Sequence, residues 1–99
     1  MNSVDNLSLS RWRSLDARAA LCELADHVEE DRTYRPMGGV KTTRLHVSAA
    51  GHDWELLVSG PKFFDTRSGQ GGGGAVDLAM HLFALRFKGA VSLLQERGL

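Results

Sequence analysis

Five of the six residues from Gly69 to Gly74 are glycine, and this run immediately precedes an apolar stretch, AVDLAMHLFAL, at residues 75–85. Glycine has no Cβ atom, so it permits sharp turns and close backbone approaches, but it weakens helices and strands. The stretch that follows is apolar on nearly every side, which is typical of a well-covered helix. We therefore expect a glycine-rich loop that reverses the chain ahead of a buried helix.

The glycine spacing does not predict a nucleotide-binding loop. Gly69, Gly71 and Gly74 match G-x-G-x-x-G, but a dinucleotide-binding fold needs a second parallel strand after the helix, and only helical patterns follow here. A phosphate-binding P-loop needs Lys and then Ser or Thr after its last glycine, where this chain has Ala75 and Val76. Both classes of nucleotide site are therefore excluded.

A weaker chemical role remains for the same loop. A helix that starts near Gly74 presents free backbone N–H groups and a partial positive charge, which favour a bound anion such as a phosphate of DNA. The residues of this expected anion-binding loop are Gly71, Gly72, Gly73 and Gly74. Asp77 argues for the alternative, a purely structural turn, because its carboxylate can itself satisfy the helix terminus.

The remaining patterns predict a small α+β domain. Leu21, Leu24, Ala25 and Val28 follow helical spacing, which predicts a helix over residues 15–30. The other expected elements are a loop at 31–41 around Pro36 and Gly38-Gly39, an antiparallel hairpin of strands 42–48 and 54–60, a short third strand at 62–65, and a last helix over 86–99. The predicted fold thus has an N-terminal helix, a small antiparallel sheet of two to three strands, the glycine-rich loop and two C-terminal helices. Residues 1–13 are expected to be a flexible N-terminus, and residues 14–99 a single module.

Charge is balanced overall but unevenly distributed. The chain has 12 basic and 12 acidic residues, so its net charge gives no argument for a polyanionic partner. Residues 32–52, however, contain Arg32, Arg35, Lys41 and Arg44 and no acid. This basic segment is either a binding surface or a solvated loop and strand, and the composition leaves both open.

Metal and catalytic signatures are absent from the sequence. The four histidines, His27, His46, His52 and His81, are scattered, and two of them near a hairpin turn make a poor zinc site without further soft ligands. Cys22 is the single cysteine, which excludes an internal disulfide, and its apolar neighbours predict a buried thiol. No nucleophile motif is present, so we expect a non-catalytic protein without metal or cofactor.

No targeting segment is evident in the sequence. It begins without a charged-then-apolar signal and contains no apolar run of about 18 residues. We expect a cytoplasmic protein that does not contact membranes.

The segment from Phe63 to about Leu94 resembles the zinc-binding domain of bacterial DNA primases, a zinc-ribbon-like domain with Cys-His-Cys-Cys ligands. In that family a short strand leads to a Cys-x-x-Cys knuckle, a glycine run and an apolar helix with an acid near its start. Here Phe63-Phe64 takes the place of the strand, Gly72-Gly73 that of the glycine pair, and Asp77 that of the acid. Residues 84–87 match the turn after the helix, and Ala90-Val91 begins the last helix.

The zinc ligands of that family have no counterparts in this chain. Thr66 and Gly69 stand where the two cysteines of the knuckle belong. The resemblance is therefore to metal-free variants of the domain, like those of plasmid and mobile-element replication proteins. Buried aromatic residues would have to replace the stability that zinc supplies elsewhere.

The resemblance implies a non-catalytic domain that binds nucleic acid, single-stranded DNA above all, in replication or priming of a plasmid or other mobile element. Its partner would be a primase or polymerase subunit. Tyr34 or Phe64 could stack on a base, although we expect Phe64 in the core. The residues expected to contact nucleic acid are Arg32, Tyr34, Arg35, Lys41, Arg44, Lys62 and Arg67. The alternative is a protein-interaction module that docks on a polymerase, primase or relaxase without touching DNA.

Overall fold

The computed structural model describes residues 5–36 and 41–99, which form four helices and one five-stranded antiparallel sheet. Each strand pairs with its neighbour in the chain, so the strand order is β1-β2-β3-β4-β5. The elements are α1 (Asn6–Ser14), α2 (Ala17–Leu24), β1 (His27–Glu30), β2 (Thr43–Ala49), β3 (His52–Ser59), β4 (Lys62–Asp65), β5 (Gln70–Gly73), α3 (Ala75–Phe83) and α4 (Phe87–Glu96). The α+β class is as predicted.

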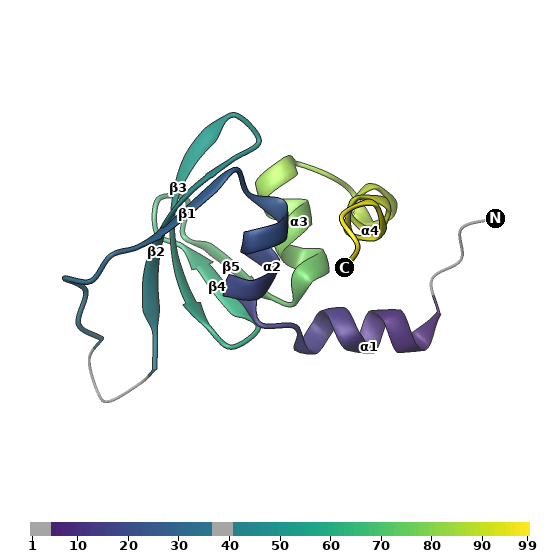
Figure 1. The fold of residues 1–99 in the computed structure, drawn as a ribbon, viewed down its shortest axis with the longest axis horizontal. Coiled ribbons are helices and arrows are strands. Elements are labelled where there is room, and N and C mark those ends of the chain that lie inside the picture. Colours follow the sequence, from purple (N-terminus) through teal and green to yellow (C-terminus); the bar gives the residue numbers. More distant parts are fainter. Residues whose placement is uncertain (1–4, 37–40) are drawn as a thin grey trace.

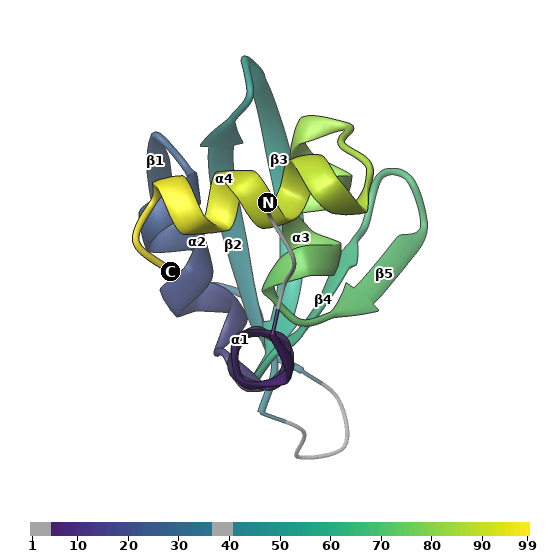
Figure 2. The same cartoon turned by 90° about the vertical axis from the view of Figure 1, so that its right-hand side faces the viewer.

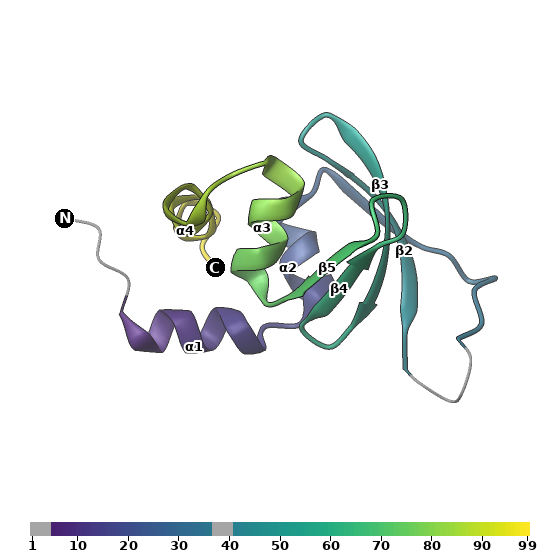
Figure 3. The same cartoon turned by 180° about the vertical axis from the view of Figure 1, so that it is seen from behind.

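The helices lie on one side of the sheet, and the other side is open. Figure 1 shows α2 and α3 against the sheet with α1 and α4 farther out, and Figure 3 shows the same layers from behind. Figure 2 looks onto the helices and places β1 and β5 at the two edges of the sheet. Leu45 of β2, Leu56 of β3 and Leu78 of α3 are fully buried between the layers.

The prediction of two to three strands was wrong. The expected hairpin and third strand correspond to β2, β3 and β4, but β1 and β5 extend the sheet at its two edges. The expected helix over 15–30 ends at Leu24, where Ala25 adopts extended backbone angles. Val28, counted as part of the helix, instead pairs with Val47 of β2. One inward residue on a strand satisfies the same apolar spacing as a further helical turn, so periodicity alone could not separate the two.

The glycine-rich loop was also predicted wrongly, because residues 70–73 form strand β5. Lys62 pairs with Gly73, Phe63 with Gly72 and Phe64 with Gly71 along the ladder to β4. Glycine has low strand propensity because it adds no packing contacts of its own, so the neighbouring strand and helix must supply them. Tertiary contacts therefore overrode the local preference of these residues.

Helix α1, Asn6–Ser14, lies where part of the expected flexible segment over residues 1–13 was placed. Asp5 caps α1 by accepting a hydrogen bond from the backbone N–H of Ser8 at 2.7 Å. Trp12 anchors the helix, because its side chain lies in the core. Residues 1–4 and the expected Gly38-Gly39 turn lie outside the described residues. Within residues 5–36 and 41–99, no helix is long and apolar enough to cross a membrane.

Candidate nucleic-acid interface on the open face of the sheet

The open face of the sheet carries a row of side chains that crosses four strands. Directly paired residues of antiparallel strands project from the same face. Leu57 pairs with Arg44 on one side and with Phe64 on the other, and Phe64 pairs with Gly71. These four residues therefore form one line from β2 to β5, and we call it the open-face row.

Phe64 is the exposed aromatic residue of this row. Its neighbour Phe63 is only 5% exposed and faces the helices, whereas Phe64 is 43% exposed. The expectation that Phe64 lies in the core was therefore wrong, since two consecutive strand residues must face opposite sides. A Cβ atom added at Gly71 would lie 3.2 Å from Cδ1 of Phe64, so the ring lies close against bare glycine backbone.

Arg44, Tyr34 and Asp31 form a compact group at one end of the row. The Arg44 guanidinium donates to Oδ2 of Asp31 through Nε at 2.9 Å and Nη2 at 2.6 Å. It also lies 5.3 Å from the centre of the Tyr34 ring. The Thr33 hydroxyl and then Arg44 lower the pKa of Asp31, while Asp31 raises the pKa of Arg44. Sequence analysis missed Asp31. Its carboxylate already accepts hydrogen bonds from the Arg44 guanidinium.

The other predicted contact residues surround the row without forming one cluster. Arg32, Arg35 and Lys41 are exposed, and the Arg35 guanidinium donates to the backbone carbonyls of Arg32 and Tyr34. Lys62 is exposed where β4 begins, opposite Ser59. Arg67 lies at the other end of the sheet, where its guanidinium donates to the Asp53 carbonyl at 3.1 Å.

The geometry gives no support to the expected anion site at Gly71–Gly74. The backbone N–H of Gly73 donates to Oδ2 of Asp77 at 3.1 Å, and that of Gly74 donates to the Pro61 carbonyl at 2.9 Å. An anion at the start of α3 would be repelled by the Asp77 carboxylate. This agrees with the alternative of a purely structural turn, in which Asp77 itself satisfies the helix terminus. A Cβ atom at Gly72 would lie 3.0 Å from Cβ of Asp77, so glycine is needed here for close packing.

A buried carboxylate, that of Asp65, organises the turn at residues 66–69. Oδ1 of Asp65 accepts hydrogen bonds from the backbone N–H groups of Arg67 and Ser68, at 3.0 and 3.3 Å. Oδ2 of Asp65 lies 2.7 Å from Nε2 of His81 on α3. The Thr66 hydroxyl donates to Oε1 of Glu55 at 2.7 Å. Side-chain hydrogen bonds thus fix the turn to both the sheet and α3.

Asp65 remains charged in this setting. Burial raises the pKa of Asp65, but the contact with His81 and the N–H groups of Arg67 and Ser68 outweigh that effect, and the pKa is lowered overall. Sequence analysis missed the pair of Asp65 and His81. The available signal was an acid directly before a Thr-Arg-Ser-Gly turn, which is a common side-chain-capped turn.

No metal site is evident among the described residues. No group of three or more His, Cys, Asp or Glu side chains in that part of the chain could hold a metal ion. His46 lies on the open face near Asp31, whereas His52 packs edge-on against Trp54. Cys22 is exposed on α2, so the expectation of a buried thiol was wrong.

Comparison with known proteins identifies one partial relative and no family. No family model and no solved structure matches the chain. A "65 kDa protein" of Zymomonas mobilis subsp. mobilis is 41% identical over 46 residues, which are 46% of this chain and 8% of that protein. The chain therefore matches only a small part of a much longer relative, whose name states no activity.

Proposed function

We propose that the open face of the sheet binds single-stranded nucleic acid, DNA in the first instance, as a non-catalytic accessory surface in replication or priming of a mobile element. The observation that carries this proposal is the exposed Phe64 ring on the open face of the sheet, with the exposed Lys62 two residues before it on the same face of β4. A base can stack on such a ring whatever its identity, and each stacked base contributes about 1–3 kcal/mol.

The spacing of the open-face row fits a strand of nucleic acid that runs across the sheet. Adjacent strands lie about 4.8 Å apart, so Phe64 on β4 and Arg44 on β2 are separated by roughly 10 Å. One base would stack on Phe64 and another on Tyr34, which Arg44 holds in place, with apolar Leu57 between them. Lys62 and Arg67 supply cations at the two ends of β4 for the phosphates.

The resemblance to primase zinc-binding domains supports the same proposal. The order of strand, turn, glycine pair, acid and apolar helix in that family corresponds here to β4, residues 66–69, β5, Asp77 and α3. In place of zinc, the Asp65 carboxylate and the Thr66 hydroxyl hold the turn. A primase or polymerase is the partner that this resemblance implies.

The decisive experiment measures binding of a fluorescent oligo(dT) of about 12 nucleotides, a length within the usual range of site sizes. Fluorescence anisotropy should show saturable binding that weakens from about 50 to 200 mM salt, because phosphate contacts release counterions. Complete absence of binding at the lower salt contradicts the proposal. It leaves the alternative of a protein-interaction module without DNA contact.

A matched pair of substitutions locates the binding face. Phe64→Ala removes the stacking ring and should weaken oligo(dT) binding about tenfold, which is 1.4 kcal/mol. Phe87→Ala is the control, since Phe87 is 45% exposed but lies on the helical side. Lys62→Gln should lower the salt dependence without abolishing binding. Equal losses in the two phenylalanine variants would place the nucleic acid elsewhere.

A further inference from the structure

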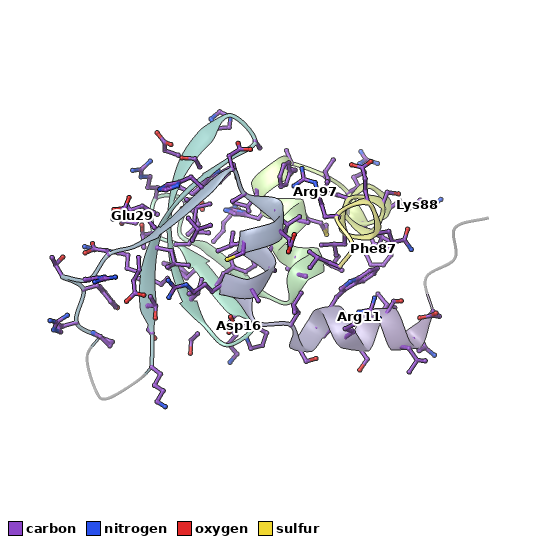
Figure 4. The ribbon with its side chains drawn as sticks, in the orientation of Figure 1. Arg11, Asp16, Glu29, Phe87, Lys88 and Arg97 are labelled. Carbon is purple, nitrogen blue, oxygen red and sulfur yellow. The ribbon has the colours of Figure 1, made fainter. Side chains whose placement is uncertain are left out.

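His81 belongs to α3, but its ring packs against the inner face of the sheet. Helix α3 lies between the sheet and α4, the helix on which Figure 4 labels Phe87. The side chain of His81 is 15% exposed. Its ring centre lies 5.4 Å from that of Trp54 on β3 and 5.7 Å from that of Phe63 on β4. These aromatic contacts hold the imidazole in one place between the helix and the sheet.

One ring nitrogen of His81 holds the carboxylate of Asp65. Nε2 of His81 lies 2.7 Å from Oδ2 of Asp65, whose residue is only 3% exposed. An ionised carboxylate can only accept hydrogen bonds, so Nε2 carries the hydrogen and donates it. Without this donor, Oδ2 would be left buried and lacking its partner, which is costly for a charged group. His81 therefore fixes the position of the Asp65 carboxylate.

The second oxygen of Asp65 fixes the backbone that carries Arg67. Oδ1 accepts hydrogen bonds from the backbone N–H groups of Arg67, at 3.0 Å, and of Ser68, at 3.3 Å. In such a turn the aspartate side chain takes the place of a backbone acceptor. A shift of the carboxylate would therefore shift the turn, and with it the origin of the Arg67 side chain.

The Arg67 guanidinium is held at one end of the sheet and still has donors to offer. Nη1 of Arg67 donates to the backbone carbonyl of Asp53 on β3 at 3.1 Å, and the residue is exposed. A guanidinium carries five N–H donors, so this one bond leaves donors for a phosphate. A group that is already held in position loses less conformational freedom when its ligand binds. Its backbone anchor therefore matters for the affinity of this cation.

We propose that His81 is a positioning residue for nucleic-acid binding, which acts through Asp65 to place Arg67 against a phosphate. This inference rests on the proposed function of the open face. The contacts run from α3 to the turn at residues 66–69 over 2.7 Å and then 3.0 Å. His81 does not touch the nucleic acid in this arrangement, because its ring packs on the inner face of the sheet. Helix α3 thus takes part in binding on the opposite face.

A double-mutant cycle with fluorescent oligo(dT) tests the proposal. In the wild type, Arg67→Gln should weaken binding about threefold and make the salt slope less steep by about 0.7, as expected for one lost phosphate contact. His81→Phe keeps an aromatic ring in place but removes the hydrogen bond to Asp65, and it should cause a similar loss. Arg67→Gln should then change little further, because residues that act through one another are not additive. Losses that multiply overturn the proposal, as does wild-type binding by His81→Phe.

Two variants separate positioning from a general loss of folding. His81→Gln offers an amide N–H in place of Nε2–H and should restore most of the binding that His81→Phe loses. Lys62→Gln, at the other end of β4, should have its full effect in the His81→Phe background, because distant sites add. Failure of His81→Gln to restore binding overturns the proposal. So does a Lys62→Gln effect that disappears together with that of Arg67→Gln.

Asp65→Asn gives a second test where His81→Phe does not fold. It weakens the same hydrogen bonds, so it should reduce the effect of Arg67→Gln on oligo(dT) binding. An undiminished effect of Arg67→Gln in this background overturns the proposal. If the wild type does not bind oligo(dT) at all, both the proposed function and this inference fail. Additive losses in a wild type that does bind leave the proposed function standing and remove the role of His81 alone.

Discussion

Phe64 and Phe87 are nearly equally exposed, yet they sit in contrasting settings on opposite sides of the molecule. Phe64 lies on the open sheet face against bare glycine backbone, whereas Phe87 borders a groove between helices. An exposed ring on an open face can stack with planar bases, and a groove accepts a ridge of side chains. Exposure alone therefore says little about a ligand, because the shape around the exposed ring decides what can cover it.

Charge separates the two sides further. On the open face, Arg44 is neutralised by Asp31, and Arg67 is engaged by a backbone carbonyl. On the helical side, Arg13 and Lys88 have no acidic partner within the described part of the chain. Binding on the open face should thus combine stacking with a salt-screened attraction of phosphates to Lys62 and Arg67.

The largest difference between the sides should appear in stability. Leu45→Ala removes a fully buried side chain on the inner face and should lower the free energy of unfolding by about 3 kcal/mol. Leu57→Ala, on the open face, should cost about 1 kcal/mol or less, because Leu57 is only half-buried. Urea denaturation measures both. Equal losses would mean that the open face is covered in solution, for example by a second molecule.

Asp65→Asn should cost about 2 kcal/mol near neutral pH, since it weakens charge-assisted hydrogen bonds to the turn. The pKa of Asp65 is lowered in the folded protein, so this stabilisation is fully present above the unfolded value of 3.8. It is lost as the pH falls through the lower folded pKa. The gap in unfolding free energy between wild type and variant should therefore shrink below about pH 4. A gap that stays constant down to the acid limit would contradict this role for the charged carboxylate.

Gly72→Ala should destabilise the protein by about 1.5 kcal/mol, because the new methyl group would press on Asp77 and Phe63 at the junction with α3. Gly73→Ala is the matched control, since a Cβ atom there meets nothing within 4 Å. The Gly73→Ala substitution should be neutral or slightly stabilising, because alanine restricts the unfolded chain more than glycine does. Thermal melts of the two variants compare the inner and open faces of one strand. Similar melting temperatures of the two variants would show that close packing of Gly72 against α3 contributes little to stability.

The smallest expected effect is the difference in oligo(dT) binding between the two phenylalanine variants. Phe64→Ala should lose about 1.4 kcal/mol of binding free energy, and Phe87→Ala should lose none. Fluorescence anisotropy of the labelled oligo(dT) measures both. Equal losses would place the nucleic acid elsewhere.

Several features of the open face were predictable from the sequence, and their grouping was not. The alternation in "KFFD" requires one of its two phenylalanines to face solvent, but it does not say which. The basic segment was evident, yet the pairing of Arg44 with Asp31 depends on a strand, β1, that was read as helix. The contact between Asp65 and His81 joins residues sixteen positions apart, and no periodic pattern signals it.

The sequence by itself determined the α+β class, the hairpin of β2 and β3, and the apolar helix after the glycine run, because each depends on local periodicity or turn chemistry. Only the tertiary structure decided that the glycines form β5. Its three consecutive glycines, Gly71 to Gly73, have no strand preference of their own. They become a strand because β4 offers a hydrogen-bonding edge, and because Asp77 and Phe63 leave room at Gly72 for bare backbone alone.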